Sequence, residues 1–275
     1  VQDGPRPLLR DEQDQAGPTH RRTVSGRDEI VSRLSGHRAA DAYADVMSDS
    51  AVPDIADPAL PGVVADPTVT NLPSGYCYGV TRYADIILAH SFPRLWGEIV
   101  TALDSFTIDF DTDIVVGGGG RARHTARFDQ SLYDQGWNKH NVQIEKLIDQ
   151  TPIFKTRSHE IDVFKLGEDD WYPGVAVEME WNNKDPFYHR DLNNFSGLHN
   201  EGVIAVGVIV TRGPGLQDML ERGALAGHYP GSKYGRSTTH WDKLTPVVNL
   251  GGGGQCPLLL VGIEEDRVTG WPAGL

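Results

Sequence analysis

The sequence is poor in cysteine and contains no long apolar segment. Its 275 residues include two cysteines, and because Cys256 lies in an apolar, strand-like run, a disulfide framework is not expected. No run approaches the ~18 to 20 consecutive apolar residues that a membrane-spanning helix needs. The first residues are polar and lack the apolar core of a secretory signal peptide. These absences predict a soluble protein of the reducing cytoplasm with no membrane partner.

Positive charge is also scarce. Lysine and arginine number 25 against 38 aspartates and glutamates, which gives a formal net charge of −13 at pH 7. Phosphate contacts depend on local positive potential, so this balance argues against unspecific binding of nucleic acid. It does not exclude DNA, because acidic groups that lie outside a cleft leave a basic groove intact.

Residues 1–80 differ in character from the rest of the chain. Residues 1–26 are polar, and apolar residues then recur at helical spacing over 27–47. Five prolines between Pro53 and Pro73 exclude a long helix or a central strand there. We predict an N-terminal extension over 1–80, partly helical and then a proline-rich arm, followed by the main folded domain over 81–275.

Two strand-like runs between Ile161 and Trp181 carry three carboxylates. In a strand, the period of two places Glu178 and Glu180 on one face, while Val175, Val177 and Met179 occupy the other. Turn-forming residues over 167–174 predict a hairpin that brings Asp162 beside Glu178. Gathered carboxylates repel one another unless a cation neutralises them, and Mg²⁺ prefers carboxylate oxygens together with water and substrate phosphate. The alternative is a strand face that is only solvated.

A second acidic run lies at Phe106 to Val116. Its residues favour a strand, in which Asp109, Asp111 and Asp113 would alternate along one face. A second metal site is conceivable there, although a solvated strand face is the preferred interpretation.

The segments Ser158–Lys165 and Val175–Trp181 resemble the metal-binding hairpin of the BglII/BstYI restriction endonucleases, a branch of the PD-(D/E)xK nuclease superfamily. The resemblance continues on both sides, in the family's order, over roughly residues 82–265. It is carried there by Phe92–Ile99, Leu132–Trp137, Val203–Val210, Gln217–Leu220 and Gln255–Ile263. It implies an α/β (α+β) fold in which helices flank a central mixed β-sheet, and it makes 81–275 an endonuclease domain.

The resemblance also implies a function. A member of this family would be a type II restriction endonuclease that hydrolyses phosphodiester bonds of double-stranded DNA with Mg²⁺ at a short palindrome, related to the GATC core of the family's known targets. A palindrome matches a twofold homodimer in which each subunit cuts one strand. A cognate DNA methyltransferase is expected in the same system.

Three carboxylates carry the implied chemistry. Asp162 and Glu178 would hold Mg²⁺, and Glu180 occupies the position where the superfamily usually has lysine, which leaves the proton acceptor in doubt. Glu180 would bind a second ion or orient and deprotonate the attacking water. If the loop displaced Asp162, Asp169 or Asp170 would take its place.

Further residues are candidates by their position. Glu98, on an expected helix, is a candidate auxiliary group near the metal, although an ordinary exposed helical glutamate is the simpler interpretation. The amide and basic side chains that follow the second strand are suited to contacts with DNA bases, and the alternative is an ordinary turn sequence. Basic clusters elsewhere are suited to contacts with phosphates, and the alternative is a solvated surface. The candidate DNA-binding residues are Asn182, Asn183, Lys184, Arg121, Arg123, Lys233 and Arg236, with His124 and Arg127 in the same basic cluster.

Two other functions remain open. A protein of the same fold could bind DNA, specifically or not, without turnover, although three retained carboxylates speak against this. A carboxylate-pair hydrolase of sugars needs two acids across a cleft rather than on adjacent strands.

Overall fold

In the computed structural model, residues 63–116, 120–156, 158–184 and 186–272 are described, and all belong to one compact unit. The predicted helix and arm over 1–62 lie outside these residues. A strand at 76–80 is paired within the main sheet, so the folded body begins ahead of residue 81. Among the described residues, no helix is both long enough and apolar enough to cross a bilayer.

A six-stranded sheet forms the centre, in the order β1-β9-β8-β7-β6-β3. β8 runs parallel to β7 and β9, whereas β1, β6 and β3 pair antiparallel with their neighbours. The sheet is therefore mixed, as predicted. Its strands are β1 (Tyr76–Val80), β3 (Asn138–Val142), β6 (His159–Lys165), β7 (Gly174–Glu180), β8 (Ile204–Arg212) and β9 (Leu258–Ile263).

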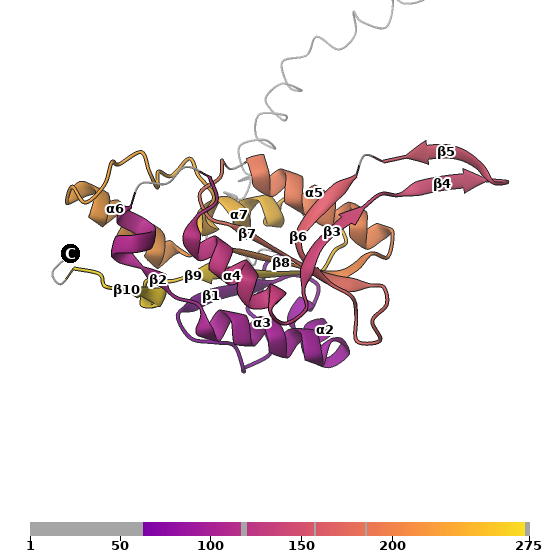
Figure 1. Cartoon of the computed structure of the whole chain (residues 1–275), viewed down its shortest axis with the longest axis horizontal. Helices are drawn as coiled ribbons and strands as arrows, with labels where there is room; N and C mark the ends of the chain where they lie inside the picture. Colours follow the sequence, from indigo (N-terminus) through magenta and orange to yellow (C-terminus); the bar gives the residue numbers. More distant parts are fainter. Residues whose placement is uncertain (1–62, 117–119, 157, 185, 273–275) are drawn as a thin grey trace, which may run out of the picture. The chain divides into compact units, whose positions relative to one another are not determined.

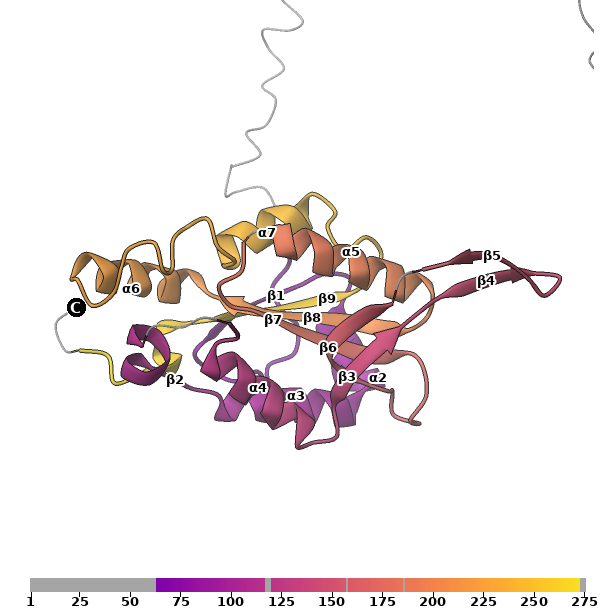
Figure 2. The same cartoon turned by 45° about the horizontal axis from the view of Figure 1, so that its top comes forward.

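Helices cover both faces of this sheet (Figures 1 and 2). One face packs against α5 (Pro186–Asn200) and α7 (Trp241–Asn249), and the other against α2 (Ala84–Ser91), α3 (Pro93–Ser105) and α4 (Arg123–Tyr133). Each face buries its own hydrophobic cluster, because β7 and β8 send alternate apolar side chains to opposite sides. The continuous aliphatic run of β8 is buried on both faces, as its sequence predicts. α6 (Pro214–Leu225) follows β8 directly.

The expected strand over Phe106–Val116 is wrong for most of its length. Only β2 (Ile108–Asp109) is extended, where it pairs with β10 (Val268–Thr269), and η2 (Phe110–Val115) is a π-helical turn. The carboxylate of Asp109 accepts a hydrogen bond from the Thr112 N–H at 2.8 Å and so begins this turn. Asp109 thus caps the turn and Asp113 pairs with Arg127, so the alternating aspartates do not share a strand face. The short 3₁₀ turn η3 (Glu265–Arg267) precedes β10.

A two-stranded hairpin of β4 (Glu145–Ile148) and β5 (Thr151–Lys155) extends away from the sheet (Figures 1 and 2). It lies between β3 and β6 in the sequence, so those two strands meet at its base. All nine residues of its strands are exposed.

Candidate active site

The hairpin of β6 and β7 places two of the predicted carboxylates opposite each other. The strands pair antiparallel with Val163 opposite Val177, and Asp162 and Glu178 are the next residues of the two strands beyond this last pair. The backbone N–H of Asp162 donates a hydrogen bond to Oε1 of Glu178 at 3.2 Å. Directly opposed residues of a strand pair share a face of the sheet. The two acidic groups therefore lie together, on the face covered by α5.

Glu180 lies two residues further along β7, on the same face as Glu178. Its Oε2 accepts a hydrogen bond from Nδ2 of Asn183 at 2.6 Å, and its Oε1 lies 3.6 Å from Nη2 of Arg190. The structure thus brings together two residues that the sequence analysis assigned to different roles, one to catalysis and one to DNA.

Helix α5 adds a fourth carboxylate that the sequence analysis missed. Asp191 is 2% exposed, and Nε of Arg190 donates a hydrogen bond to its Oδ1 at 2.8 Å. The negative charge of Asp191 contributes to the raised pKa values of both Glu178 and Glu180, which places it electrostatically within the same cluster. The only hint in the sequence is an Arg-Asp pair in the helix that follows Asn182 to Lys184.

The pKa values of the two buried glutamates are strongly raised. Burial raises the pKa of Glu178 to about 8, with further contributions from the charges of Asp162 and Asp191. Burial also raises the pKa of Glu180 to about 8, followed by the charge of Asp191, and the hydrogen bond from Asn183 opposes this shift. Without a cation, the cluster therefore retains protons at neutral pH that ordinary glutamates would release.

The carboxylate oxygens of this acidic cluster are the type of ligand that a hard divalent cation prefers. Among the described residues, no group of three or more histidine, cysteine, aspartate or glutamate side chains is arranged to hold a metal ion. Asp162 and Glu178, the two predicted ligands, lie beside each other as a pair. Mg²⁺ takes one or two protein carboxylates and fills its remaining positions with water and substrate phosphate. Asp162 and Glu178 fit that requirement.

An open cleft of about 870 Å³ lies along the C-terminal end of β7. Asp162 and Glu180 line it, and Glu178, which is 6% exposed, lies behind them. Five of the seven predicted DNA-binding residues also line it, namely Asn182, Asn183, Arg121, Arg123 and Lys233. Acidic and DNA-binding candidates that are separate in the sequence therefore share one cleft.

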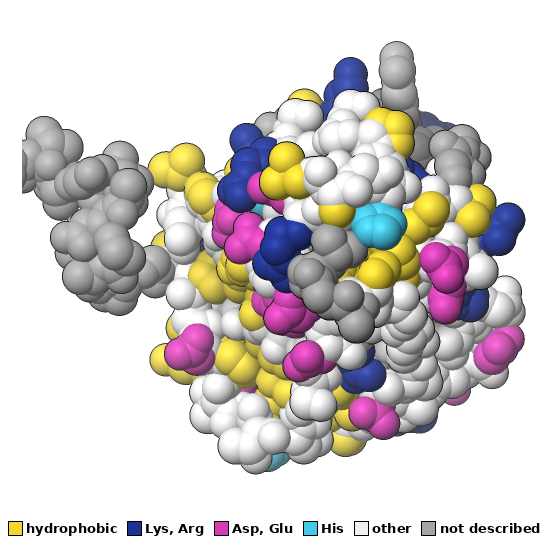
Figure 3. Space-filling view, turned by 90° about the vertical axis from the view of Figure 1, so that its left-hand side faces the viewer, with side chains coloured by type: hydrophobic (Ala, Val, Ile, Leu, Met, Phe, Trp, Pro, Cys, Tyr) yellow, Lys and Arg dark blue, Asp and Glu magenta, His cyan; other side chains and the backbone are white. Residues whose placement is uncertain are grey.

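The cations of this cleft differ in how firmly they are held. Arg121 forms an ion pair with Asp129, and Nζ of Lys233 donates a hydrogen bond to the carbonyl of Val116 at 2.9 Å. Arg123 is exposed and makes no ion pair with any residue that the structure describes. Arg123 is thus the cleft cation most available to a phosphate. On the face at the left-hand side of Figure 1, basic side chains alternate with acidic ones and form no continuous basic strip (Figure 3).

Other members of the predicted basic clusters have structural partners. Arg236 does not line the cleft, and its Nε lies 2.8 Å from Oε1 of Glu221. Arg127 binds the carboxylate of Asp113 at 2.6 Å. His124 is fully buried beside Trp181, with 4.1 Å between ring centroids. Lys184 is exposed and immediately follows the cleft residues of the loop.

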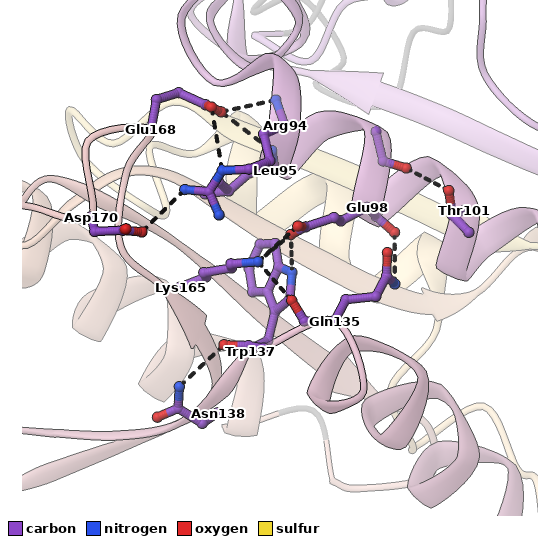
Figure 4. A network of polar contacts seen from close by, with 12 residues as sticks. Arg94, Leu95, Glu98, Thr101, Gln135, Trp137, Asn138, Lys165, Glu168 and Asp170 are labelled. Atoms are coloured by element: carbon purple, nitrogen blue, oxygen red, sulfur yellow. Dashed lines mark hydrogen bonds and ion pairs between the residues drawn. The ribbon is translucent and has the colours of Figure 1, made fainter.

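Glu98 is placed away from the acidic cluster. Its carboxylate lies 2.7 Å from Nζ of Lys165 and accepts a hydrogen bond from the indole N–H of Trp137 at 2.8 Å (Figure 4). Lys165 lies three positions from Asp162 on β6, so its side chain points to the opposite face of the sheet. Glu98 therefore neutralises a lysine on the α3 side, and it does not approach the predicted metal ligands.

Asp169 and Asp170, the alternative ligands, lie in the loop that joins β6 to β7. Oδ1 of Asp170 is 3.4 Å from Nη2 of Arg94, at the start of α3. Asp162 lies beside Glu178, so the displacement for which Asp169 or Asp170 was the alternative is not seen.

Comparison with known proteins agrees with this arrangement. A family model described as restriction endonuclease BglII/BglIII matches residues 76–263, more than half of the 275-residue chain. The match begins with β1, ends with β9, and so contains all six strands of the central sheet and the β6–β7 hairpin. No curated protein matches the chain.

Proposed function

Because the chain belongs to the restriction endonuclease BglII/BglIII family, we propose that it cleaves double-stranded DNA at a specific short sequence in a Mg²⁺-dependent reaction. The observation that supports this most directly is the facing of Asp162 and Glu178 across β6 and β7, beside the cleft of the matched domain. The product would be a hydrolysed phosphodiester bond in each strand.

In this proposal, Asp162 and Glu178 would hold Mg²⁺ together with water and the scissile phosphate. When bound, the ion would lower the pKa of water and neutralise negative charge on the phosphate. Glu180, held by Asn183, orients the attacking water and accepts its proton.

DNA recognition is assigned to the loop after β7 and to the rim of the cleft. Asn182, Asn183 and Lys184 reach base edges, since amide side chains can form paired hydrogen bonds with adenine and lysine can bind guanine. Arg123 contacts a phosphate. Arg121 and Lys233, which are held by their own partners, position the wall of the cleft. Arg236 is paired with Glu221 outside the cleft and is assigned no contact with DNA in this proposal.

We further propose a homodimer acting on a palindrome, with a sequence related to GATC and a cytoplasmic location beside a cognate methyltransferase. A twofold axis relating two clefts would place one acidic cluster against each strand.

The test is digestion of plasmid DNA by the purified full-length chain. Discrete fragments with Mg²⁺, and none with EDTA, are expected, and sequencing the fragment ends gives the site and the cleavage position together. A smear would indicate a non-specific nuclease. Tight binding without any cutting would indicate a DNA-binding protein that does not turn over.

A further inference from the structure

The pairing of β3 with β6 is irregular beside the acidic cluster. Asn138 is paired with Phe164 and His140 with Ile161, so the single residue Lys139 faces both Asp162 and Val163. Two residues opposing one is a β-bulge, a feature that redirects side chains and is frequent next to active sites. The irregularity falls at the proposed metal ligand Asp162.

Lys139 consequently reaches the carboxylates of β6. Its Nζ lies 2.5 Å from Oε1 of Glu160 and 3.3 Å from Oδ1 of Asp162. It also lines the cleft together with Asp162 and Glu180. An ammonium group therefore stands where a phosphodiester held at Asp162 would lie.

The ion pairs of Lys139 with Glu160 and Asp162 are weak enough to be replaced by a contact with substrate. The side chains of Lys139, Glu160 and Asp162 are 46%, 46% and 48% exposed, and ion pairs this open to solvent contribute only about 0 to 1 kcal/mol. Arg190, the other cation beside the cluster, is held by the carboxylate of Asp191, which is almost fully buried. A substrate can therefore recruit Lys139 at little cost, whereas recruiting Arg190 would expose a buried charge.

We infer that Lys139 is a catalytic residue that donates hydrogen bonds to a non-bridging oxygen of the scissile phosphate when DNA occupies the cleft. The inference rests on the proposed nuclease function. The ammonium group favours the transition state because negative charge on the phosphate oxygens is greatest there. Glu160 keeps the lysine oriented toward the cleft until DNA arrives.

The test compares Lys139→Met with Lys146→Met in the full-length protein. Lys146 is a matched control, because it is 53% exposed and its Nζ lies 3.0 Å from Oε1 of Glu201, away from the cleft. Single-turnover cleavage is measured with Mg²⁺, and affinity for the same duplex with Ca²⁺ in its place. We expect Lys139→Met to lower the cleavage rate by roughly 10²-fold or more. We expect its DNA affinity to fall by less than about tenfold near 0.1 M salt, as for loss of one phosphate contact. Lys146→Met should change neither.

Restoring the amine gives a second readout. Lys139→Cys treated with 2-bromoethylamine regains an ammonium group at nearly the same position, and its cleavage rate should recover. Wild-type protein treated in the same way controls for alkylation of Cys77, which is partly exposed.

The outcomes separate this inference from the proposed function. Suppose that the wild-type protein cuts DNA and that Lys139→Met either cuts it as fast or loses cleavage rate only in proportion to its loss of affinity. The catalytic role of Lys139 is then wrong, and the proposed nuclease function is unaffected. If the wild-type protein cuts no DNA with Mg²⁺, both fall.

Discussion

The backbone N–H of Asp162 is hydrogen-bonded to the carboxylate of Glu178 at 3.2 Å, across two antiparallel strands. This contact brings the two acidic residues together at the end of the β6–β7 ladder. It also leaves Asp162 half-exposed on the cleft and Glu178 buried behind it. A cation bound by this pair would have one side open to a phosphate and one side enclosed by protein.

The stability of the metal-free protein should fall as pH rises from about 5 to about 8.5. The pKa values of Glu178 and Glu180 are near 8 in the folded protein, against an ordinary value of 4.5. Because the folded protein holds these protons more tightly than the unfolded chain, their stabilising contribution is complete below pH 4.5. It is lost as pH rises through 8. Thermal unfolding in EDTA over this range measures the effect.

Mg²⁺ should reverse this trend. Since the ion binds the deprotonated carboxylates, the rise in melting temperature that it produces should be larger at pH 8 than at pH 6. Glu178→Gln should weaken both the pH dependence and the response to Mg²⁺. A melting temperature in EDTA that stays flat or rises between pH 5 and pH 8.5 would contradict the raised pKa values.

Glu98→Ala should destabilise the fold without removing a group from the active site. Glu98 and Lys165 have side chains 18% and 14% exposed, so the loss should lie between about 1 kcal/mol, as for an exposed ion pair, and the about 3 to 5 kcal/mol of a fully buried one. Urea unfolding gives the loss in free energy, and Glu98→Gln, which can still accept the indole N–H of Trp137, should lose less. Folded Glu98→Ala protein should retain cleavage. Loss of cleavage with unchanged stability would return Glu98 to the catalytic machinery.

Arg123→Ala and Arg236→Ala should differ in DNA binding. Arg123 lines the cleft without an ion pair to a described residue, whereas Arg236 lies outside it and is paired with Glu221. Removing one phosphate contact lowers the slope of log affinity against log salt concentration by about 0.9. Arg123→Ala should show this change and Arg236→Ala should not, in fluorescence anisotropy over a range of salt with Ca²⁺. Equal slopes for the two variants would remove Arg123 from the interface.

The strands that carry the acidic pair could be predicted because their signals are local. Alternation from Val175 to Glu180 fixes the shared face of Glu178 and Glu180, and the turn residues over 167–174 predict the hairpin that brings Asp162 to Glu178. The aliphatic run of β8 likewise predicts a buried central strand.

The remaining site residues depend on tertiary packing and have no comparable signal. Asp191 enters the cluster because α5 packs over β7, and Lys139 because pairing with β6 is irregular. The helix that carries Glu98 was expected, and Leu95 and Ile99 on α3 are buried. The path of the chain decides which face of the sheet α3 covers. Because α3 lies on the face opposite the acidic cluster, Glu98 pairs with Lys165 and not with the predicted metal ligands.

The most direct measurement is single-turnover cleavage, with Mg²⁺, of a duplex that carries the mapped site, by the wild-type protein and by Glu178→Ala. Specific binding of the same duplex is measured with Ca²⁺, and Glu265→Ala, which removes an exposed carboxylate paired with Arg222, is the control. We predict that Glu178→Ala loses cleavage by roughly 10³-fold or more while it still binds the site, and that Glu265→Ala cleaves normally. Substantial residual cleavage by Glu178→Ala would contradict the assignment of the Asp162 and Glu178 pair as the catalytic centre.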